Sequence, residues 1–218
     1  ILSKKPMKLR ITEIFLSLQG ETRTVGVPTV FIRLTGCPLR CGYCDTAYAF
    51  QGGEMMEIEQ VLEQVRHLGA RFVTVTGGEP LAQKACLALL KALCDENFEV
   101  SLETSGAISL EAVDPRVVKV MDIKTPASKE SHRNHGPNLD YLSPKDQIKF
   151  VICDENDYRW SKEMLLTHQL HQRCEVLFSP VYPEMSPTVL ADWILADCLP
   201  VRFQIQLHKF LWGETPGK

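Results

Sequence analysis

Short strand-like runs alternate with helix-like runs along most of this sequence, and the alternation restricts the fold more than any single motif does. It is typical of a parallel sheet with right-handed helical crossovers. About seven such units in 218 residues fall short of a closed eight-stranded barrel, which takes about 250 residues. We therefore predict an α/β fold with a partial, open β/α barrel of six to seven parallel strands, although a doubly wound sheet fits the alternation equally well. The strand-like runs are 29–36, 71–78, 98–106, 117–124, 147–152, 174–180 and 201–209, and the helix-like runs are 57–69, 81–97, 161–172 and 187–198.

The composition is that of an ordinary globular protein, with 44% hydrophobic and 23% charged residues. We predict a single domain over residues 1–218, with an N-terminal extension at 1–8 and a long irregular loop at 125–146. A net charge of −3 gives no reason to expect nucleic-acid binding, and no apolar run is long enough to span a membrane. Because no export signal is recognisable, we expect a cytoplasmic protein with reduced cysteines.

Three cysteines, Cys37, Cys41 and Cys44, lie close together in the segment GCPLRCGYCDT. Thiolates from such a short loop can ligate one iron–sulfur cluster. Three protein ligands would leave one iron open to a small molecule. The alternative is a structural zinc site completed by a distant fourth ligand such as His67, but the second cysteine pair that is usual in such sites is absent from the sequence. The other five cysteines are predicted to be inert.

Polar and glycine-rich motifs repeatedly follow the strand-like runs, and ligand sites form at the carboxyl ends of parallel strands. Gly77 and Gly78 in TVTGGEP permit close backbone approach, and Glu79 offers a carboxylate that could hold an amino group. Arg33 is suited to bidentate capture of a carboxylate. The Asp-Thr pair that ends at Thr46 could offer oxygen to Mg²⁺ or could cap a helix.

The CxxxCxxC loop and the TGGEP motif resemble those of the radical S-adenosylmethionine (SAM) superfamily. The motifs EIFLSLQGE, FIRLTGCPLRCGYCDT, TVTGGEP, ETSG and QLHKF are similar to those of the 7-carboxy-7-deazaguanine synthase family, over about residues 8–210. The resemblance implies a 4Fe-4S cluster, SAM and Mg²⁺ as cofactors. It implies a carbon–nitrogen lyase that converts 6-carboxy-5,6,7,8-tetrahydropterin to 7-carboxy-7-deazaguanine with loss of ammonia, in queuosine and deazapurine biosynthesis. It also implies a flavodoxin or ferredoxin as reductant and a homodimeric state.

The same resemblance assigns site residues position by position and leaves the radical chemistry to the cofactor rather than to a catalytic side chain. Relatives carry a Ser-Pro-Lys contact to SAM where this chain has residues 122–124, and its own Ser-Pro-Lys lies later, at 143–145. The implied metal ligands are Cys37, Cys41 and Cys44 for the cluster and Thr46 for Mg²⁺; the SAM contacts are Gly78, Glu79, Glu103, Asp122, Ile123, Lys124 and Ser179; the substrate contacts are Leu18, Gln19, Gly20, Arg33, Thr76, Gln206 and His208.

Two other functions share part of this pattern. A radical SAM activase, which generates a glycyl radical on a partner protein, would use the same cysteine loop but needs a site that admits a polypeptide. An iron–sulfur electron carrier or a zinc-stapled interaction domain would need a fourth ligand and has no use for TGGEP. The LQGE and QLHK motifs favour a pocket for a small molecule, so the lyase is the favoured hypothesis.

Overall fold

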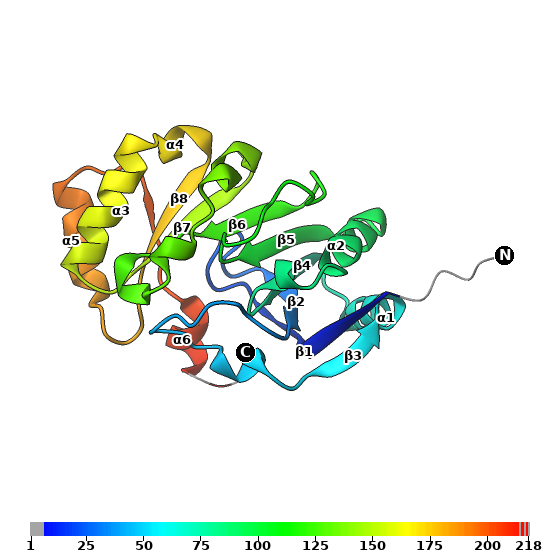
Figure 1. The fold of residues 1–218 in the computed structure, drawn as a ribbon. Helices are drawn as coiled ribbons and strands as arrows, with labels where there is room; N and C mark the ends of the chain where they lie inside the picture. The colour runs from blue at the N-terminus through cyan, green and yellow to red at the C-terminus, as the bar shows by residue number, and fades with distance from the viewer. Residues whose placement is uncertain (1–6, 214, 216, 218) are drawn as a thin grey trace.

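The computed structural model describes residues 7–213, 215 and 217, and its centre is one curved sheet (Figure 1). The strands lie side by side in the order β3-β1-β2-β4-β5-β6-β7-β8-β9. They are β1 (Lys8–Leu18), β2 (Pro28–Leu34), β3 (Glu54–Glu57), β4 (Phe72–Gly77), β5 (Glu99–Thr104), β6 (Val118–Asp122), β7 (Gln147–Ile152), β8 (Glu175–Pro180) and β9 (Arg202–Phe203).

Seven of these strands, β2 and β4 to β9, run parallel, whereas β1 is antiparallel to both of its neighbours, β2 and β3. Because β3 and β9 form two unpaired edges, the sheet does not close. The predicted open barrel of six to seven parallel strands is therefore confirmed. Within the described part of the chain, no helix has the length and apolar character needed to cross a membrane.

All helices but the last pack along the outer side of the curved sheet, as expected for a partial barrel and unlike the two-sided cover of a doubly wound fold (Figure 1). The last helix lies at the open, concave side. The first of them begins after a capping box between Glu57 and Gln60 and ends at Gly69, whose φ of 74° suits glycine. The helices are α1 (Ile58–Leu68), α2 (Cys86–Asp95), α3 (Glu155–Thr167), α4 (Leu170–Arg173), α5 (Pro187–Ala196) and α6 (Leu207–Trp212).

The hydrophobic core lies between these helices and the sheet. Strand residues such as Val73, Val75, Leu102 and Ile148 are fully buried in it. Burial of such side chains supplies most of the free energy that favours folding. The opposite, concave side of the sheet carries polar strand residues such as Arg33, Glu103 and Lys149.

Several stretches differ from the sequence prediction. Strand β3 was not predicted, and the helix expected at 161–172 is α3, which begins at Glu155 and ends at Thr167, followed by the short α4. Strand β1 was expected only as an N-terminal segment, and of the predicted extension, residues 1–6 lie outside the described residues. The predicted strand at 201–209 is a strand only at Arg202–Phe203, and α6 follows. The backbone leaves the sheet there because Leu207 N donates to Gly20 O (3.1 Å) and the Gln204 side chain donates to Thr22 O (3.2 Å). These bonds draw the chain onto the loop after β1.

The segment from 125 to 146 contains no strand and three 3₁₀ helices, η3 (Pro126–Ser128), η4 (Ser131–Arg133) and η5 (Gly136–Tyr141). Asn138 organises it from within: its side chain accepts from Leu110 N and donates to Gly106 O and Ile108 O at 2.9–3.0 Å. Because this amide is fully buried and fully bonded, the segment is held against the end of β5.

Candidate active site

One cavity of about 440 Å³ lies on the concave side, where the parallel strands end. Its wall combines the cysteine loop, the loop after β1, the ends of β4 to β7 and the start of α6. Fifteen of the eighteen site residues predicted from the sequence line it: Leu18, Gln19, Gly20, Arg33, Cys37, Cys41, Cys44, Thr46, Thr76, Gly78, Glu103, Asp122, Lys124, Gln206 and His208.

The cysteine loop leaves the end of β2 and is held down by the glycine turn that ends β4. Gly78 N donates to Leu34 O (3.2 Å), and Glu79 N donates to Gly36 O (2.9 Å). A methyl group on Gly78 would lie 2.7 Å from Cys37 Cβ, closer than real Cβ atoms come. Glycine is therefore required at this position, because it lets the cysteine loop lie directly on the end of the neighbouring strand.

The three thiols of this loop are free and partly buried, and they share one end of the cavity. Burial raises the pKa of Cys41 to about 11; Lys124 opposes this shift, and Asp122 and the other two cysteines add to it. In the described part of the chain, no three acidic, histidine or cysteine side chains surround a single ion-sized point, and His67 is not in the cavity wall. Three separated thiols without a fourth ligand fit a cluster with several irons better than a zinc ion.

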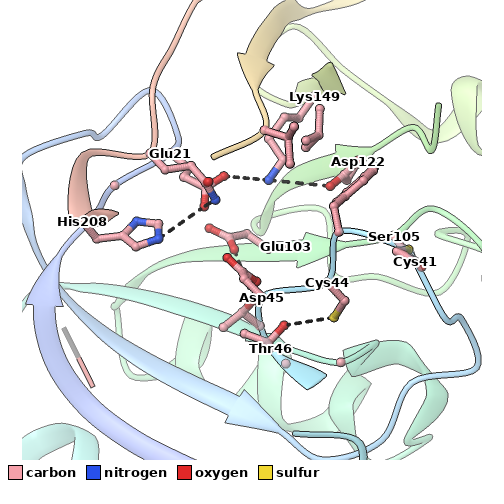
Figure 2. A pocket seen from close by; sticks show the side chains of 18 of the residues that line it. Glu21, Cys41, Cys44, Asp45, Thr46, Glu103, Ser105, Asp122, Lys149 and His208 are labelled. Atoms are coloured by element: carbon pink, nitrogen blue, oxygen red, sulfur yellow. Dashed lines mark hydrogen bonds and ion pairs between the residues drawn. The ribbon is translucent and has the colours of Figure 1, made fainter. Parts of the chain in front are cut away.

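Thr46 and Asp45 follow the cysteines and face the same cavity. Thr46 occupies the N-cap position of the 3₁₀ helix η1 (Ala47–Phe50), yet its side chain makes no capping bond. Its hydroxyl lies 3.8 Å from Cys44 Sγ (Figure 2). One Asp45 oxygen lies 3.6 Å from Lys209 Nζ. A hydroxyl and a carboxylate at the cavity wall are hard oxygen donors of the kind that Mg²⁺ takes.

A row of charged side chains, joined by ion pairs, lies across the far side of the cavity (Figure 2). Lys149 Nζ lies 2.9 Å from Glu21 and 3.7 Å from Asp122, and Lys124 Nζ lies 3.0 Å from the same Asp122 oxygen. The other oxygen of Asp122, Oδ1, is buried and has no hydrogen-bond partner in the protein. Glu21 also accepts from Gln206 Nε2 at 3.0 Å. The site thus offers one unused buried acceptor beside two ammonium groups.

Sequence analysis missed Glu21 and Lys149 as site residues. A signal existed for Lys149, because a charged residue in the middle of the apolar run QIKFVI needs a buried partner. That partner is Glu21, which belongs to the quoted LQGE motif but was not assigned a role. The two residues are 128 positions apart, so only the folded sheet shows that they meet.

Two acids in the cavity are shifted in opposite directions. Burial alone would raise the pKa of Glu21, but the charges of Lys149 and His208 and the Gln206 hydrogen bond outweigh it and lower the pKa to about 2. For Glu103, burial raises the pKa, and the negative Glu21 adds to this, against Lys149 and Arg33. The cavity therefore holds one firmly ionised carboxylate and one carboxyl group that keeps its proton to higher pH.

Arg33 is fixed before any ligand arrives. Its Nε donates to Glu13 Oε1 at 2.7 Å, and the Tyr48 hydroxyl donates to the same oxygen at 2.7 Å. The guanidinium lies 5.9 Å from the ring centres of both Phe15 and Tyr48. An arginine held by a carboxylate and two rings keeps its remaining donors in one direction, which suits recognition of a planar anion.

The LQGE turn is built around Gln19, which is buried. Its Oε1 accepts from Gly20 N (2.8 Å) and Glu21 N (3.2 Å), and its Nε2 donates to Thr74 Oγ1 and to Glu103 Oε1 (3.3 Å). Gly20 lies against His208, and an added methyl group would lie 2.5 Å from His208 Nδ1. The turn therefore brings the loop after β1 into direct contact with the start of α6.

Three predicted residues do not line the cavity: Glu79, Ile123 and Ser179. Glu79 is fully buried, and its oxygens accept from Leu81 N, Thr104 Oγ1 and Ser105 N and Oγ at 2.5–3.0 Å. This carboxylate ties the glycine turn to the end of β5, and the predicted contact of Glu79 with SAM stays a prediction. Ile123 and Ser179 are buried in the protein interior.

The structure also separates the two segments considered for the Ser-Pro-Lys contact. Asp122 and Lys124 face the cavity, whereas residues 143–145 lie outside its wall. There Ser143 bonds to Asp146 at 2.8 Å, and Lys145 donates to Pro115 O. The strand end after β6 is therefore the segment placed to contact a ligand.

Comparison with known proteins agrees with this geometry. Residues 31–122 match the model of the radical SAM superfamily. The chain is 42% identical over 208 residues to the 7-carboxy-7-deazaguanine synthase of Chlorobaculum tepidum, covering 94% of each chain, and 41% identical over 225 residues to that of Koribacter versatilis, covering 96% of this chain and all of the relative. The crystal structure of QueE from Escherichia coli superposes with a TM-score of 0.77 at 25% identity, over 93% of this chain and 95% of that one.

A more distant likeness extends to the fold alone. Streptococcus suis SuiB bound to S-adenosylmethionine superposes with a TM-score of 0.56 at 15% identity, over 78% of this chain and 45% of that chain. The curved, open sheet is thus shared with proteins whose sequences have diverged widely.

Proposed function

Because the chain belongs to the 7-carboxy-7-deazaguanine synthase family of radical SAM enzymes, we propose that its cavity converts 6-carboxy-5,6,7,8-tetrahydropterin to 7-carboxy-7-deazaguanine with loss of ammonia. The chain is a radical SAM enzyme of queuosine and deazapurine biosynthesis, and a glycyl-radical activase is not favoured. The observation that carries the proposal is the presence, in one 440 Å³ cavity, of the cysteine loop and of the fixed Arg33.

The cysteine loop is the cluster end of the cavity. Cys37, Cys41 and Cys44 would hold the 4Fe-4S cluster, and their protons must leave as the irons bind. When bound, the cluster and SAM together supply the 5′-deoxyadenosyl radical. The cavity wall shields this chemistry from water.

The strand end after β6 is the proposed SAM subsite. Asp122 Oδ1, the buried acceptor without a partner, would accept from the amino group of SAM. Lys124 lies 3.0 Å from Asp122 and would bind the carboxylate of SAM. Gly78 lines the cavity beside Cys37 and would contact SAM through its backbone.

The cavity wall that β2, the loop after β1 and the start of α6 form is the proposed pterin subsite. Arg33 would bind the substrate carboxylate through donors not used by Glu13. Gln206, His208 and the Gln19–Gly20 turn line the same side and would contact the heterocycle, together with Leu18 and Thr76. Glu103, whose pKa is raised by burial, also lines the cavity and would lie near the reacting ring. Glu21 stays ionised and keeps Lys149 in place.

We further propose that Thr46 supplies a ligand to Mg²⁺, because its hydroxyl is free of the capping bond that would otherwise occupy it. Asp45 offers a carboxylate beside it. Replacement of Thr46 by valine, which keeps the shape and removes the oxygen, is expected to raise the Mg²⁺ concentration needed for half-maximal rate. A homodimer and a flavodoxin or ferredoxin as reductant stay predictions.

The test is an anaerobic reaction of the cluster-reconstituted protein with SAM, dithionite, Mg²⁺ and 6-carboxytetrahydropterin, followed by mass spectrometry. We expect 7-carboxy-7-deazaguanine from the wild type and none from Cys41→Ala. Cys198→Ala is the matched control, because Cys198 is exposed and outside the cavity wall, and it should keep full activity. Cleavage of SAM with the pterin unchanged would contradict the substrate assignment and leave the radical SAM function standing.

A further inference from the structure

We infer that Glu130 is a positioning residue that fixes Cys41, the middle cysteine of the loop, relative to the residues proposed to contact SAM. The inference deepens the proposed function and rests on it, because it concerns how the cluster end and the SAM subsite of one cavity are held together. Glu130 does not line the cavity, so it would act through the backbone of the cysteine loop and not by touching a ligand.

Two backbone groups next to Cys41, one on each side, are bonded to the segment that follows β6. On one side, Arg40 N donates to Glu130 Oε1 at 2.5 Å, and on the other, Gly42 N donates to Ser128 O at 3.1 Å. A carboxylate oxygen is a stronger acceptor than a backbone carbonyl. Cys41 is therefore held from both sides, and the Glu130 side chain makes the stronger of the two bonds.

The same segment begins with the residues proposed to contact SAM. Asp122 and Lys124 line the cavity, and the segment then continues without a break to Glu130. Near its start it also approaches the cysteine loop, because Lys124 Nζ lies 5.9 Å from the centre of the Tyr43 ring. One continuous segment thus carries the proposed SAM contacts at one end and the bond that holds Cys41 at the other.

Buried Asp157, in the first turn of α3, anchors this segment. Its carboxylate accepts from Thr125 Oγ1 (2.9 Å) and from Ala127 N (3.0 Å). Ser128 Oγ donates to Thr125 O (2.6 Å) and accepts from Glu130 N (3.1 Å). These bonds order the backbone up to Glu130, so that its side chain reaches the cysteine loop from a fixed position.

Fixed spacing between the two ends of the segment matters for a ligand that spans them. SAM would contact Asp122 and Lys124 on one side and the cluster held by Cys41 on the other. A ligand that contacts two parts of a protein binds more weakly when these parts must first be ordered relative to each other. The Glu130 bond would remove this cost. Its loss should therefore weaken SAM binding and leave the pterin subsite, which other elements form, largely unchanged.

The experiment compares three variants of the full chain. Glu130→Ala removes the acceptor, whereas Glu130→Gln keeps a side-chain carbonyl that can accept from Arg40 N. The Glu130 side chain makes no capping bond to η4, so its removal does not uncap that helix. Glu63→Ala is the matched control, because Glu63 is exposed on α1 and lies outside the cavity wall.

The first measurement is amide hydrogen exchange of the cysteine loop in the cluster-free protein, which tests the bond without iron or SAM. We expect the Arg40 amide to exchange about tenfold faster in Glu130→Ala, because a hydrogen bond to a charged acceptor is lost. Exchange in Glu130→Gln should lie near the wild-type rate, and Glu63→Ala should not differ from the wild type. Equal exchange at Arg40 in Glu130→Ala and the wild type would overturn the inference.

The second measurement uses the cluster-reconstituted enzymes, with iron content determined for each. We expect the dissociation constant and the KM for SAM to rise about tenfold in Glu130→Ala per loaded cluster, with little change in the KM for the pterin. Glu130→Gln should recover most of the SAM affinity, and Glu63→Ala should keep all of it.

An unchanged affinity for SAM in Glu130→Ala would overturn the positioning role. An equal rise of both KM values would do so as well, because it would assign Glu130 to the general stability of the fold. If the wild type binds SAM but makes no deazaguanine, the proposed substrate is wrong. Hydrogen exchange and SAM affinity still decide the role of Glu130 in that case, since neither measurement uses the pterin.

Discussion

Gly78 and Cys37 lie in direct contact across the ends of two neighbouring strands, and a methyl group at Gly78 would lie 2.7 Å from Cys37 Cβ. The position of the first cluster ligand is therefore set by a residue from a different strand. The glycine turn of β4 does not only leave room for a ligand, as the sequence suggested. It also supports the cysteine loop from beneath.

Replacement of Gly78 by alanine should displace this loop. Overpacking of a close contact costs about 1–3 kcal/mol, and here the strain falls on the cluster ligands. We expect reconstituted Gly78→Ala to bind less iron than the wild type, measured by iron content and by visible absorbance. Gly136→Ala is the control, because its added methyl group meets no atom within 4 Å. Full iron binding by Gly78→Ala would contradict the contact.

Replacement of Glu79 by glutamine should destabilise the fold rather than weaken SAM binding. The glutamine NH₂ would face donors that now bond to a carboxylate, and such a buried mismatch costs about 2–3 kcal/mol. Urea unfolding measures the loss. Glu59→Gln, which alters an exposed ion pair with Arg66, should change stability by no more than about 0.5 kcal/mol. Normal stability with lost SAM affinity would restore Glu79 as a SAM contact.

The stability contributed by Glu21 should depend on pH. Its pKa is lowered from 4.5 to about 2, so its contribution is complete above pH 4.5 and is lost as the pH falls toward 2. A shift of this size corresponds to at most about 3 kcal/mol. The difference in melting temperature between wild type and Glu21→Gln should therefore shrink between pH 5 and pH 3. A difference that stays constant over this range would show that the pKa is not lowered.

Glu103 should show the opposite behaviour. Because its pKa is raised in the folded state, it favours folding at low pH, and this contribution is lost as the pH rises through the folded pKa. Near neutral pH, Glu103→Gln should thus be at least as stable as the wild type while losing activity. Paired unfolding curves at pH 4 and pH 7 test this. If Glu103→Gln were destabilised more at pH 7 than at pH 4, the pKa of Glu103 would not be raised in the folded state.

Loss of the Glu13 carboxylate should weaken substrate binding through Arg33. The Glu13→Gln side chain keeps its shape but holds the guanidinium less firmly, and a hydrogen bond to a charged group is worth about 1.5–3 kcal/mol. We expect KM for the pterin to rise about tenfold with a smaller change in kcat. Tyr48→Phe, which removes the second bond to Glu13, should have a weaker effect in the same direction. Unchanged KM in both variants would show that Arg33 needs no support.

Sequence reasoning succeeded where the determining residues are close together in the chain. The seven parallel strands and the cysteine loop follow from local patterns, and a glycine is recognisable wherever the chain must turn tightly. The same reasoning did not foresee that the Glu79 carboxylate is fully bonded inside the protein, because a motif indicates that a carboxylate is present but not which way it turns at the end of a strand. It also failed at the last predicted strand, where Leu207 N bonds to Gly20 O in the loop after β1 instead of continuing the sheet.

Lys149 shows a second limit of prediction from the sequence. Its partner Glu21 comes from the antiparallel end of the sheet, and the pair forms only when β7 and the loop after β1 face one cavity. No periodicity or spacing in the sequence predicts that these two residues contact each other. Residues whose roles depend on long-range pairing of this kind could be suspected from the sequence, since a lysine in an apolar strand is unusual, but could not be assigned.

The bonds from Leu207 to Gly20 and from Gln204 to Thr22 have a consequence for the order in which this protein is made. The Gln204 and Thr22 positions are 182 residues apart, so the ribosome must make all of the intervening chain before the loop after β1 finds its partner. Before that point the cavity lacks the wall that Gln206, His208 and Lys209 form. A sheltered site beside the three thiols therefore exists only after this C-terminal segment has been made and has docked on the loop after β1.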